Sequence, residues 1–398
     1  MGFMISFGYI EDDLILKQKK IAVLFGGVSP EHDVSILTGV QACYALDQAK
    51  YAPYPIYIDT QGRWWAGEGL LAGHKELVNS QFTKDIESVV MCHKGFLING
   101  QKKLAVDACL IALHGGAGEN GSVQGLCELY DMPYTGLRHY GAAIAMNKWL
   151  TKKTLAQLGV DVLPEHRLLR PKSGVYYTQA MLENLDLQFP VCIKPCSLGS
   201  SVGVGFADDV AAVQAQLLTL FDYDDAVLIE PAVANLKEFN VSVRKDQAGQ
   251  IQLSVVESPK AERWLDFNEK YCSGGQGKKQ SMHGLIHLSR DIEPQMPKTM
   301  RDKLEHDAKI AFEALGGAGA PRIDFLADMK QGRIWLNEVN TTPGSFGYYL
   351  WSAQKQFQGF VWLLSALLDE AFYLHGIKVS QPDDPVPNAA RLFERVPA

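Results

Sequence analysis

Two carboxylates and a carboxamide occupy positions that paired strands would bring together. Arg322 and Asp324 lie in one short apolar run, and Glu338 and Asn340 lie in the next, with a polar turn at 330–333 between the runs. Residues two apart on a strand point to the same face, so these side chains converge if the two strands pair. Carboxylate and amide oxygens are hard ligands that suit octahedral Mg²⁺. A solvated hairpin face is the weaker interpretation, because an unpaired carboxylate inside an apolar run is costly.

A second polar segment follows a short β-branched run that ends at Lys194. The loop after it contains Gly199, Ser200, Ser201 and Gly203. Glycine lets backbone N–H groups approach an anion closely, serine adds donors, and the lysine adds charge, which is a combination typical of a phosphate-binding loop. The Walker pattern GxxxxGK[ST] does not occur in the chain, and a glycine-serine loop alone is more often a simple turn.

Hydrophobic periodicity predicts an α/β fold that places these segments at strand ends. Apolar runs predict strands at 21–25, 54–58 and 108–113, and helical spacing predicts helices at 34–46 and 121–130. Strands that alternate with helices indicate a doubly wound parallel sheet, in which ligands gather at the carboxyl ends of the strands. The other predicted strands are 191–194, 226–229, 240–244, 251–256, 322–326 and 334–339, and the other helices are 148–158, 207–221, 300–315 and one of about 25 residues from Tyr349.

Composition is that of an ordinary globular enzyme. The 398 residues are 47% hydrophobic, which excludes disorder for most of the chain. The net charge of −7 argues against general binding to nucleic acid. The seven cysteines are scattered, and the nearest pair, Cys192 and Cys196, lacks CxxC spacing, so we expect reduced core thiols rather than a zinc site.

No targeting or membrane segment is expected. Acidic residues at 11–13 interrupt the apolar residues of the N-terminus, which argues against a signal peptide. The longest apolar run, 359–368, has ten residues, whereas a membrane span needs about twenty. A cytoplasmic protein without membrane partners is therefore expected.

Six motifs occur in order: EHDVS (31–35), HGGAGENGSVQG (114–125), MNKWLTK (146–152), IKPCSLGSSVGV (193–204), RID (322–324) and NEVNTTPG (337–344). Together they resemble the D-alanine:D-alanine ligase family of the ATP-grasp superfamily, from about residue 19 to residue 375. The resemblance implies an ATP-grasp architecture: a Rossmann-like substrate domain at 19–146, a central ATP-binding subdomain at 147–237, and a metal and acceptor domain at 238–378. Residues 1–18 and 379–398 are then terminal extensions.

The resemblance also implies how ATP is bound. Lys148 and Lys194 match the lysines that hold the α- and β-phosphates, and Glu230 and Glu238 match the residues that hold adenine and ribose. Ser201 matches the loop that closes over the nucleotide.

For the metals, Asp324, Glu338 and Asn340 match the ligands of two Mg²⁺ or Mn²⁺ ions. Arg322 matches the arginine that stabilises the transferring phosphoryl group, and the N–H of Gly344 matches part of an oxyanion site. These residue types suit phosphoryl transfer followed by acyl transfer.

For the amino-acid substrates, Glu31 matches the carboxylate that takes the first ammonium group, with His32 beside it. Ser200 links Glu31 to Tyr271 on a mobile loop, where Lys270 contacts the acceptor carboxylate. The polar, glycine-rich segment 269–283 is expected to act as a lid that excludes water.

One segment departs from the family. After Gly344 the family usually has a serine that contacts the acceptor carboxylate, and here Tyr349 and Leu350 occupy that part of the pocket. The implied reaction is ATP-dependent joining of two amino acids through an acyl phosphate. D-alanine with D-alanine for peptidoglycan is the first hypothesis, another acceptor the second, and an inactive ATP-binding relative the third. The family suggests a homodimer.

Overall fold

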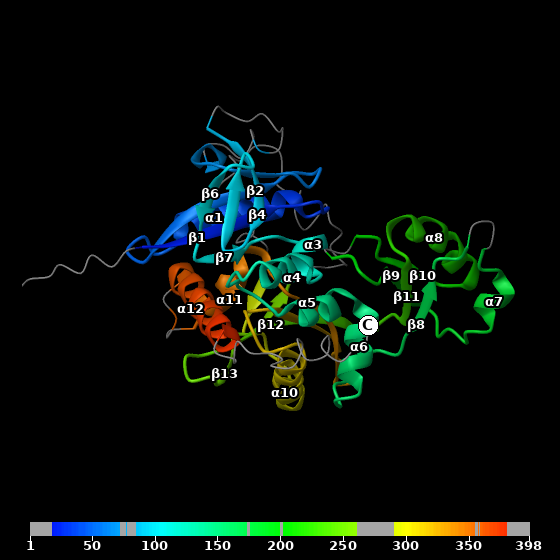
Figure 1. Ribbon diagram of the computed structural model, residues 1–398. Coiled ribbons are helices and arrows are strands. Elements are labelled where there is room, and N and C mark those ends of the chain that lie inside the picture. The colour runs from blue at the N-terminus through cyan, green and yellow to red at the C-terminus, as the bar shows by residue number, and fades with distance from the viewer. Residues whose placement is uncertain are drawn as a thin grey trace, which may run out of the picture.

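The computed structural model describes residues 18–71, 77, 85–172, 176–199, 202–260, 290–354, 357 and 359–379. These residues form three sheets with helices packed on them (Figure 1). The mixed α/β architecture expected from the sequence is confirmed.

The first sheet has the strand order β6-β5-β4-β3-β2-β1-β7. Its parallel part, β2-β1-β7, is where the alternation of strands and helices predicted it. The sheet continues on one side with short antiparallel strands that hydrophobic periodicity did not predict. The strands are β1 (Lys19–Gly26), β2 (Tyr51–Ile58), β3 (Trp64–Ala66), β4 (Glu87–Cys92), β5 (Gly95–Ile98), β6 (Lys102–Ala105) and β7 (Ala108–Ile111).

Helices cover both faces of the parallel part, which explains the continuous apolar run of its central strand β1. Ile21, Val23 and Phe25 pack with α1 (His32–Ala45) and α12 (Gly359–Val379). Ala22 and Leu24 pack on the other face, where α4 (Ser122–Leu129) lies. The same region of the chain also contains the 3₁₀ helix η1 (Glu68–Leu71) and the short α-helix α3 (Gly116–Glu119).

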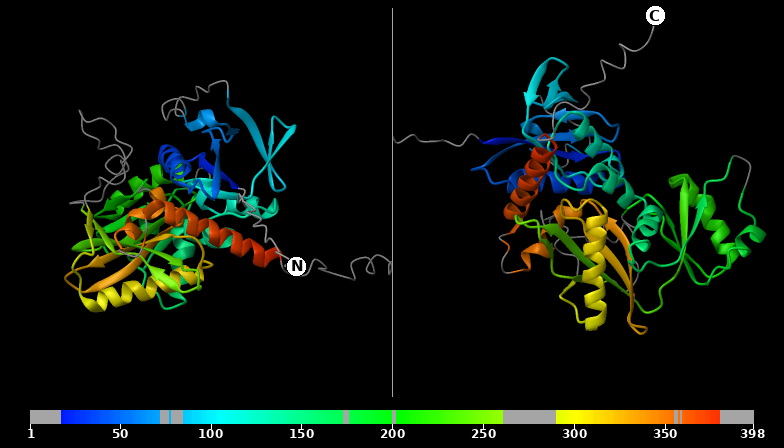
Figure 2. Two further views of the ribbon diagram at one scale, coloured as in Figure 1. Left: turned by 90° about the vertical axis from the view of Figure 1, so that its left-hand side faces the viewer. Right: turned by 60° about the horizontal axis from the view of Figure 1, so that its bottom comes forward.

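The second sheet, β10-β9-β11-β8, is antiparallel and projects to one side of the molecule with α7 and α8 (Figure 2, right). Val191 and Ile193 of β9 pack against Val213 and Leu217 of α8. The elements are β8 (His166–Leu169), α7 (Gln179–Glu183), β9 (Val191–Pro195), β10 (Gly205–Ala207), α8 (Val210–Tyr223) and β11 (Ala226–Pro231).

The third sheet has the order β15-β14-β12-β16-β17, with β13 paired to β12. On β12, Phe239, Val241 and Val243 face a core formed with α5, α6 and α10. Since side chains alternate along a strand, Asn240 and Ser242 face the opposite side. The elements are α5 (His139–Met146), α6 (Lys148–Ala156), β12 (Leu236–Lys245), β13 (Ile251–Leu253), β14 (Glu257–Pro259), β15 (Arg290–Ile292), α10 (Lys298–Ala314), β16 (Arg322–Asp328) and β17 (Arg333–Asn340).

The prediction of one long helix from Tyr349 is wrong, because two separate helices lie there. A short turn η3 (Gly344–Gly347) leads into α11 (Tyr348–Ser352), and α12 starts again at Gly359, whose φ is +81°. Trp351 and Phe357 pack edge to face across the break with ring centroids 5.3 Å apart. The apolar spacing therefore continues past the end of α11, and periodicity alone does not reveal that the helix ends there.

Helix α12 is long and apolar enough, by length and composition alone, to cross a membrane. One such helix is weak evidence, because core helices of globular proteins meet the same criteria. Leu363, Leu364, Leu367 and Leu368 of this helix are buried in the core beside β1 and α1.

Candidate active site

The hairpin β16–β17 brings together the four residues that the sequence placed on one face. The register pairs Arg322 with Asn340 and Asp324 with Glu338. Arg322 donates through Nε and Nη2 to the two carboxylate oxygens of Asp324, both at 2.7 Å. Asn340 Nδ2 donates to Asp324 Oδ2 at 2.9 Å. The predicted convergence of these side chains is confirmed.

Electrostatics keep this cluster charged. Burial disfavours the charged guanidinium of Arg322, but the Asp324 carboxylate outweighs burial and raises the pKa of Arg322. Glu338 pairs with Lys148, whose Nζ lies 3.2 Å from Oε2. Each carboxylate on this face therefore has a cation from the chain beside it.

Among the described residues, no group of three or more His, Cys, Asp and Glu side chains is close enough to hold a metal ion. The oxygen donors that share this face are the carboxylates of Asp324 and Glu338 and the Asn340 amide. All three are hard oxygen donors of the kind that Mg²⁺ prefers.

A buried charge cluster lies on the neighbouring strands β9 and β11. Glu230 is 1% exposed, and Lys194 Nζ lies 2.6 Å from its Oε2. Lys152 of α6 pairs with the other oxygen, Oε1. Lys194 also donates to Asn337 Oδ1 of β17 at 2.9 Å, which connects the second and third sheets.

The pKa values in this cluster follow from burial and pairing. Burial opposes the charged forms of Glu230 and Lys194, but their mutual attraction lowers the pKa of Glu230 and raises that of Lys194. For Lys152, burial dominates and lowers its pKa. Sequence reasoning gave Lys152 no role, although it ends the MNKWLTK motif, because its partner Glu230 lies far along the chain.

The start of α6 is tied to the loop after β9. Asn147 caps the helix by accepting from Leu150 N at 3.0 Å. Lys148 N donates to Cys196 O at 2.8 Å, and its side chain donates to Leu198 O. This connection holds Lys148 beside the first residues of the predicted phosphate-binding loop.

Glu31 lies where the first sheet approaches that loop. A Cβ atom added at Gly115 would lie 2.6 Å from Glu31 Oε2, and one added at Gly199 would lie 3.1 Å from it. The carboxylate therefore sits against two glycines from different loops, and a side chain at Gly115 would displace it. His32 bonds Gly27 O at 2.6 Å through Nδ1 and Tyr57 Oη at 3.0 Å through Nε2, so its ring is held within the first sheet.

Glu119, which the sequence analysis did not single out, connects the first and third sheets. Its Oε2 accepts from Gly115 N at 2.7 Å. Its Oε1 accepts from Thr341 Oγ1 and from Thr342 N, both at 2.9 Å. The residue lies inside the HGGAGENG motif, but a partner more than two hundred positions away leaves no local signal.

The turn that begins at Gly344 has a left-handed backbone. Ser345 and Phe346 have φ values of 48° and 56°, which are uncommon for residues with a side chain. Ser345 N donates to Thr38 Oγ1 at 3.2 Å, and its hydroxyl donates to Gln41 Oε1 at 2.6 Å. Helix α1 therefore holds the turn that carries Gly344.

Tyr349 is held by a cluster on β14 and β15. Its hydroxyl donates to Glu257 Oε1 at 3.1 Å. Arg290 donates to Glu257 Oε2 at 2.9 Å, and its guanidinium lies 4.0 Å from the centre of the Tyr349 ring. Leu350 is fully buried, so its side chain belongs to the core. Glu257 and Arg290 were not predicted, because both flank the predicted lid rather than any motif.

Glu238 lies on β12, on the same face as Asn240. Ser200, Ser201, Lys270, Tyr271 and the predicted lid at 269–283 lie outside the described residues.

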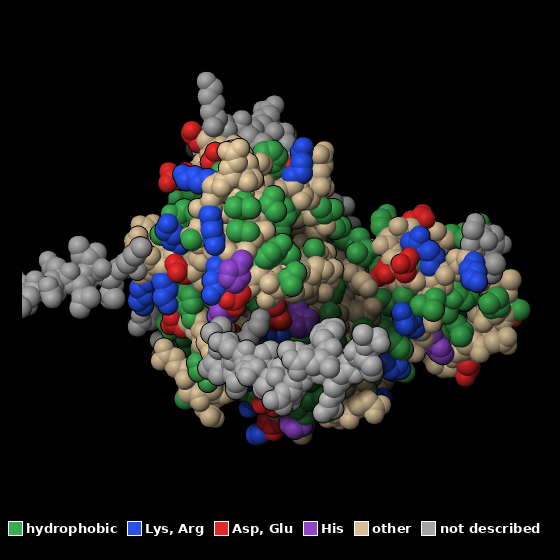
Figure 3. Space-filling view, in the orientation of Figure 1, with side chains coloured by type: hydrophobic (Ala, Val, Ile, Leu, Met, Phe, Trp, Pro, Cys, Tyr) green, Lys and Arg blue, Asp and Glu red, His purple; other side chains and the backbone are tan. Residues whose placement is uncertain are grey.

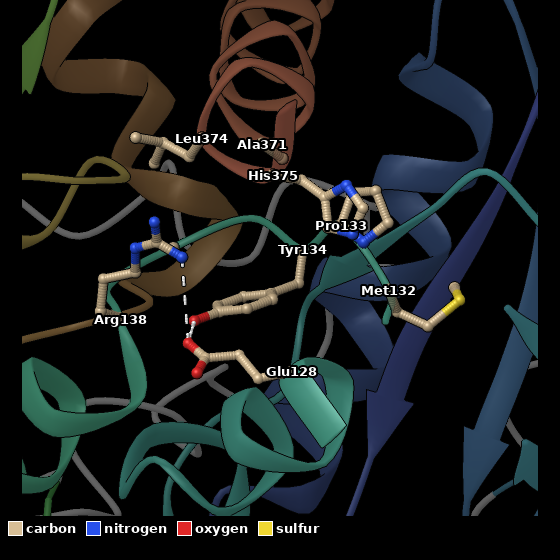
Figure 4. A pocket seen from close by; sticks show the side chains of 9 residues that line it. Glu128, Met132, Pro133, Tyr134, Arg138, Ala371, Leu374 and His375 are labelled. Carbon is tan, nitrogen blue, oxygen red and sulfur yellow. Dashed lines mark hydrogen bonds and ion pairs between the residues drawn. The ribbon is translucent and has the colours of Figure 1, made fainter. Parts of the chain in front are cut away.

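A separate pocket lies between α12 and the segment that follows α4 (Figure 4). Tyr134 donates to Glu128 at 2.6 Å on one wall, and Leu374 and His375 of α12 line another. None of the predicted site residues lines it.

Two family descriptions together match most of the chain. Residues 20–137 match the D-ala D-ala ligase N-terminus, and residues 155–369 match the D-ala D-ala ligase C-terminus.

Named relatives agree with this match. A D-alanine--D-alanine ligase of Thermosipho africanus is 34% identical over 338 residues, which cover 83% of this chain and 88% of that protein. The vancomycin C-type resistance protein VanC1 of Enterococcus gallinarum is 32% identical, with coverage of 83% and 91%. The structure of the D-alanine-D-alanine ligase from Coxiella burnetii has the same fold, with a TM-score of 0.74 at 24% identity over 95% of this chain and 98% of that one.

Proposed function

The chain belongs to the D-alanine:D-alanine ligase family, and we propose that it joins two D-alanine molecules to supply a peptidoglycan precursor. It is an ADP-forming, ATP-dependent ligase that acts on small substrates. The observation that carries the proposal is the face of the third sheet where Arg322, Asp324, Glu338 and Asn340 converge, next to Lys148 and Lys194.

The chemistry requires two transfers. A carboxylate oxygen of the first amino acid attacks the γ-phosphorus of ATP, and ADP leaves with the electrons of the broken P–O bond. The amine of the second amino acid then attacks the acyl carbon, the C–N bond forms, and phosphate leaves with the electrons of the C–O bond. The proton released by nitrogen passes to phosphate or solvent. Both steps depend mainly on positioning and on neutralising negative charge.

For ATP, we assign Lys148 and Lys194 to the α- and β-phosphates, Ser201 to the covering loop, and Glu230 and Glu238 to the adenosine. The buried pairing of Lys194 with Glu230 supports a fixed lysine at the carboxyl end of β9. A fixed charge stabilises a transferring phosphoryl group without reorganising during the reaction.

For the metals, we assign two Mg²⁺ or Mn²⁺ ions to Asp324, Glu338 and Asn340. The ion pairs with Arg322 and Lys148 support this assignment, since they show that positive charge is favoured beside both carboxylates. Bound ions of this kind neutralise phosphate oxygens and orient them for in-line transfer.

For the amino acids, we assign Glu31 and His32 to the first substrate, with Ser200 and Tyr271 linked to Glu31. Lys270 is assigned to the acceptor carboxylate. Arg322 and the N–H of Gly344 are assigned to the oxygen that becomes negative during acyl transfer. The held, left-handed turn at Ser345 supports a fixed position for Gly344.

A different acceptor is the second candidate, and Tyr349 is the observation that favours it. The Tyr349 hydroxyl donates to Glu257, whereas a family serine at this place would contact the acceptor carboxylate. In this candidate, Tyr349 and the buried Leu350 take the place of the family serine and determine which acceptor fits.

We further propose three domains, at 19–146, 147–237 and 238–378, in a cytoplasmic homodimer without nucleic-acid or membrane partners. On the face shown in Figure 3, basic and acidic side chains of the described residues are interspersed. The net charge of −7 also disfavours a polyanionic partner.

The test is ADP release with Mg²⁺ across a panel of single D- and L-amino acids and their pairs, with each product identified by mass. D-alanine alone should give ADP and D-alanyl-D-alanine in equal amounts. If ADP forms only when another amino acid is added, that acceptor replaces the second D-alanine. If no member of the panel yields ADP, the ligase proposal is contradicted.

A further inference from the structure

A buried oxygen without a hydrogen-bond donor lies beside the candidate site. Asn240 is 4% exposed, and its Oδ1 atom has no donor among the residues that the structure describes. Its Nδ2 donates to Glu257 Oε1 at 3.2 Å. This bond fixes the amide orientation, because the reverse would place two acceptor oxygens against each other. Oδ1 is therefore an acceptor that lacks a donor, which is uncommon for a buried polar atom.

Asn240 stands in a row of polar residues that crosses the third sheet. The register pairs Glu257 with Asn240, Asn240 with Asp324, and Asp324 with Glu338. Directly paired residues place their side chains on the same face of a sheet. Asn240 therefore shares its face with the groups assigned to phosphoryl transfer and lies between Asp324 and Glu257.

The far end of the row is held rigidly. Glu257 is 3% exposed and receives hydrogen bonds from Arg290, Tyr349 and Asn240. Its negative charge also favours the charged form of Arg322. A fixed Glu257 holds the Asn240 amide in one orientation, so Oδ1 is presented to a ligand at no further conformational cost.

The chemistry of Oδ1 restricts what it binds. It accepts a hydrogen bond and cannot donate one, so its ligand must carry an N–H or O–H group. An ionised carboxylate only accepts hydrogen bonds, so a substrate carboxylate cannot pair with Oδ1. The group that fits is an amine next to the Arg322 and Asp324 pair.

We propose that Asn240 Oδ1 binds the amino group of the acceptor amino acid, an inference that rests on the proposed ligase function. By accepting one N–H, it orients the nitrogen lone pair toward the acyl carbon, which the assigned role of Arg322 places nearby. Glu257, Arg290 and Tyr349 are positioning residues, since they act through Asn240.

The test compares Asn240→Ala with Asn240→Thr, because threonine keeps a hydroxyl oxygen and suits a strand. Gln252→Ala is the matched control: this amide on β13 donates to Asp246 at 2.9 Å on the same sheet and outside the row. D-alanine and MgATP are the substrates. Acceptor binding is read from the dependence of ADP release on D-alanine. The first half-reaction is read from positional isotope exchange in ATP, which reports phosphoryl transfer before the acceptor attacks.

Asn240→Ala should raise the acceptor KM on the order of ten- to a hundredfold, as expected for a lost hydrogen bond to a polar or charged group. Isotope exchange should stay within about twofold of the wild type, since the donor residues are unchanged. Asn240→Thr should recover part of the acceptor KM, and Gln252→Ala should leave it unchanged.

Two results would overturn the inference. An unchanged acceptor KM in Asn240→Ala means that Oδ1 accepts hydrogen bonds from water and not from the acceptor amino group. An equal loss of exchange and ligation means that Asn240 only supports the sheet. Failure of the proposed function is distinguishable, because the wild-type protein itself would then show neither exchange nor ADP release with D-alanine.

Discussion

Four carboxylates of the candidate site are each paired with a cation from this chain. Asp324 pairs with Arg322, Glu338 with Lys148, Glu230 with Lys152 and Lys194, and Glu257 with Arg290. Burying a charge without a partner costs far more than burying a pair. The pairing explains how so many ionised groups persist in a largely buried region, and it means that removing one partner affects both binding and stability.

Glu338→Gln tests the metal assignment at the scale of one residue. The change removes one negative ligand charge from a half-buried position while keeping the shape of the side chain. Turnover with Mg²⁺ should fall by roughly two or more orders of magnitude, and the Mg²⁺ concentration for half-maximal rate should rise. Steady-state ADP release at varied Mg²⁺ measures both.

Asp302→Asn is the control, because this exposed carboxylate pairs with Lys298 on α10, outside the candidate site. Its kinetics should match the wild type. Full activity in Glu338→Gln, or ADP release that persists in excess EDTA, would remove Glu338 from the metal set.

At this scale, the sequence predicts which residues belong to the site better than it predicts which residues they contact. Asp324 and Glu338 were predictable because a carboxylate inside an apolar run is costly to bury unless it has a partner or a ligand. Lys152, Glu119 and Glu257 were not, because their partners come from other elements and other sheets. Sequence spacing contains no information about contacts that only the packed fold creates.

At the scale of elements, the left-handed turn before α11 is constrained both by its backbone and by its contacts. Ser345 and Phe346 both adopt positive φ, which costs about 1–2 kcal/mol for each residue with a side chain. Two hydrogen bonds to α1 hold Ser345 in place. The buried Phe346 ring, 6.2 Å from that of Phe360 between centroids, adds packing.

Ser345→Gly and Ser345→Ala should separate strain from hydrogen bonding. Both lose the hydroxyl bond to Gln41, but only glycine relieves the positive φ. Ser345→Gly should therefore have a free energy of unfolding about 1 kcal/mol higher than that of Ser345→Ala, as measured by urea denaturation. Equal stability of the two variants would show that the left-handed backbone carries no strain.

Elements were predictable where apolar runs were long and bounded by turns. The hairpin β16–β17 follows from two such runs around a polar turn. Strands β3, β10, β14 and β15 have only three residues each, so the period-2 pattern has no room to appear. Their pairing comes from tertiary contacts, which outweigh local preference.

At the scale of the whole molecule, α12 connects the first sheet to the third. Its leucines pack beside β1, while Glu370 accepts from Gly319 N at 2.6 Å, just before β16. Tyr51 of β2 donates to the adjacent Asp369 at 3.2 Å. The position of the first sheet relative to the face of the third sheet that carries Asp324 and Glu338 therefore depends in part on this helix.

Glu370 should make this connection sensitive to pH. Burial raises its pKa from 4.5 to about 7, although the Gly319 N–H and the positive charges of Arg244, Lys245 and Arg138 act in the opposite direction. The folded protein thus holds the proton more tightly than the unfolded chain. The stability contributed by the protonated carboxyl is fully present below pH 4.5 and is lost as the pH rises toward 7.

Glu370→Gln should remove this loss, because the amide keeps an oxygen for Gly319 N and has no charge to bury. Relative to the wild type, its free energy of unfolding should be equal near pH 4.5 and higher by up to about 3 kcal/mol at pH 8, at 1.36 kcal/mol per pKa unit. Urea denaturation at intervals from pH 4.5 to pH 8 measures the difference.

Asp369→Asn changes the charge equally at the next position, where the carboxylate is exposed, and should leave the pH dependence of stability as it is in the wild type. A pH-independent difference between Glu370→Gln and the wild type would show that Glu370 has the same pKa in the folded protein as in the unfolded chain, and that burial at the junction of α12 with β16 does not raise it.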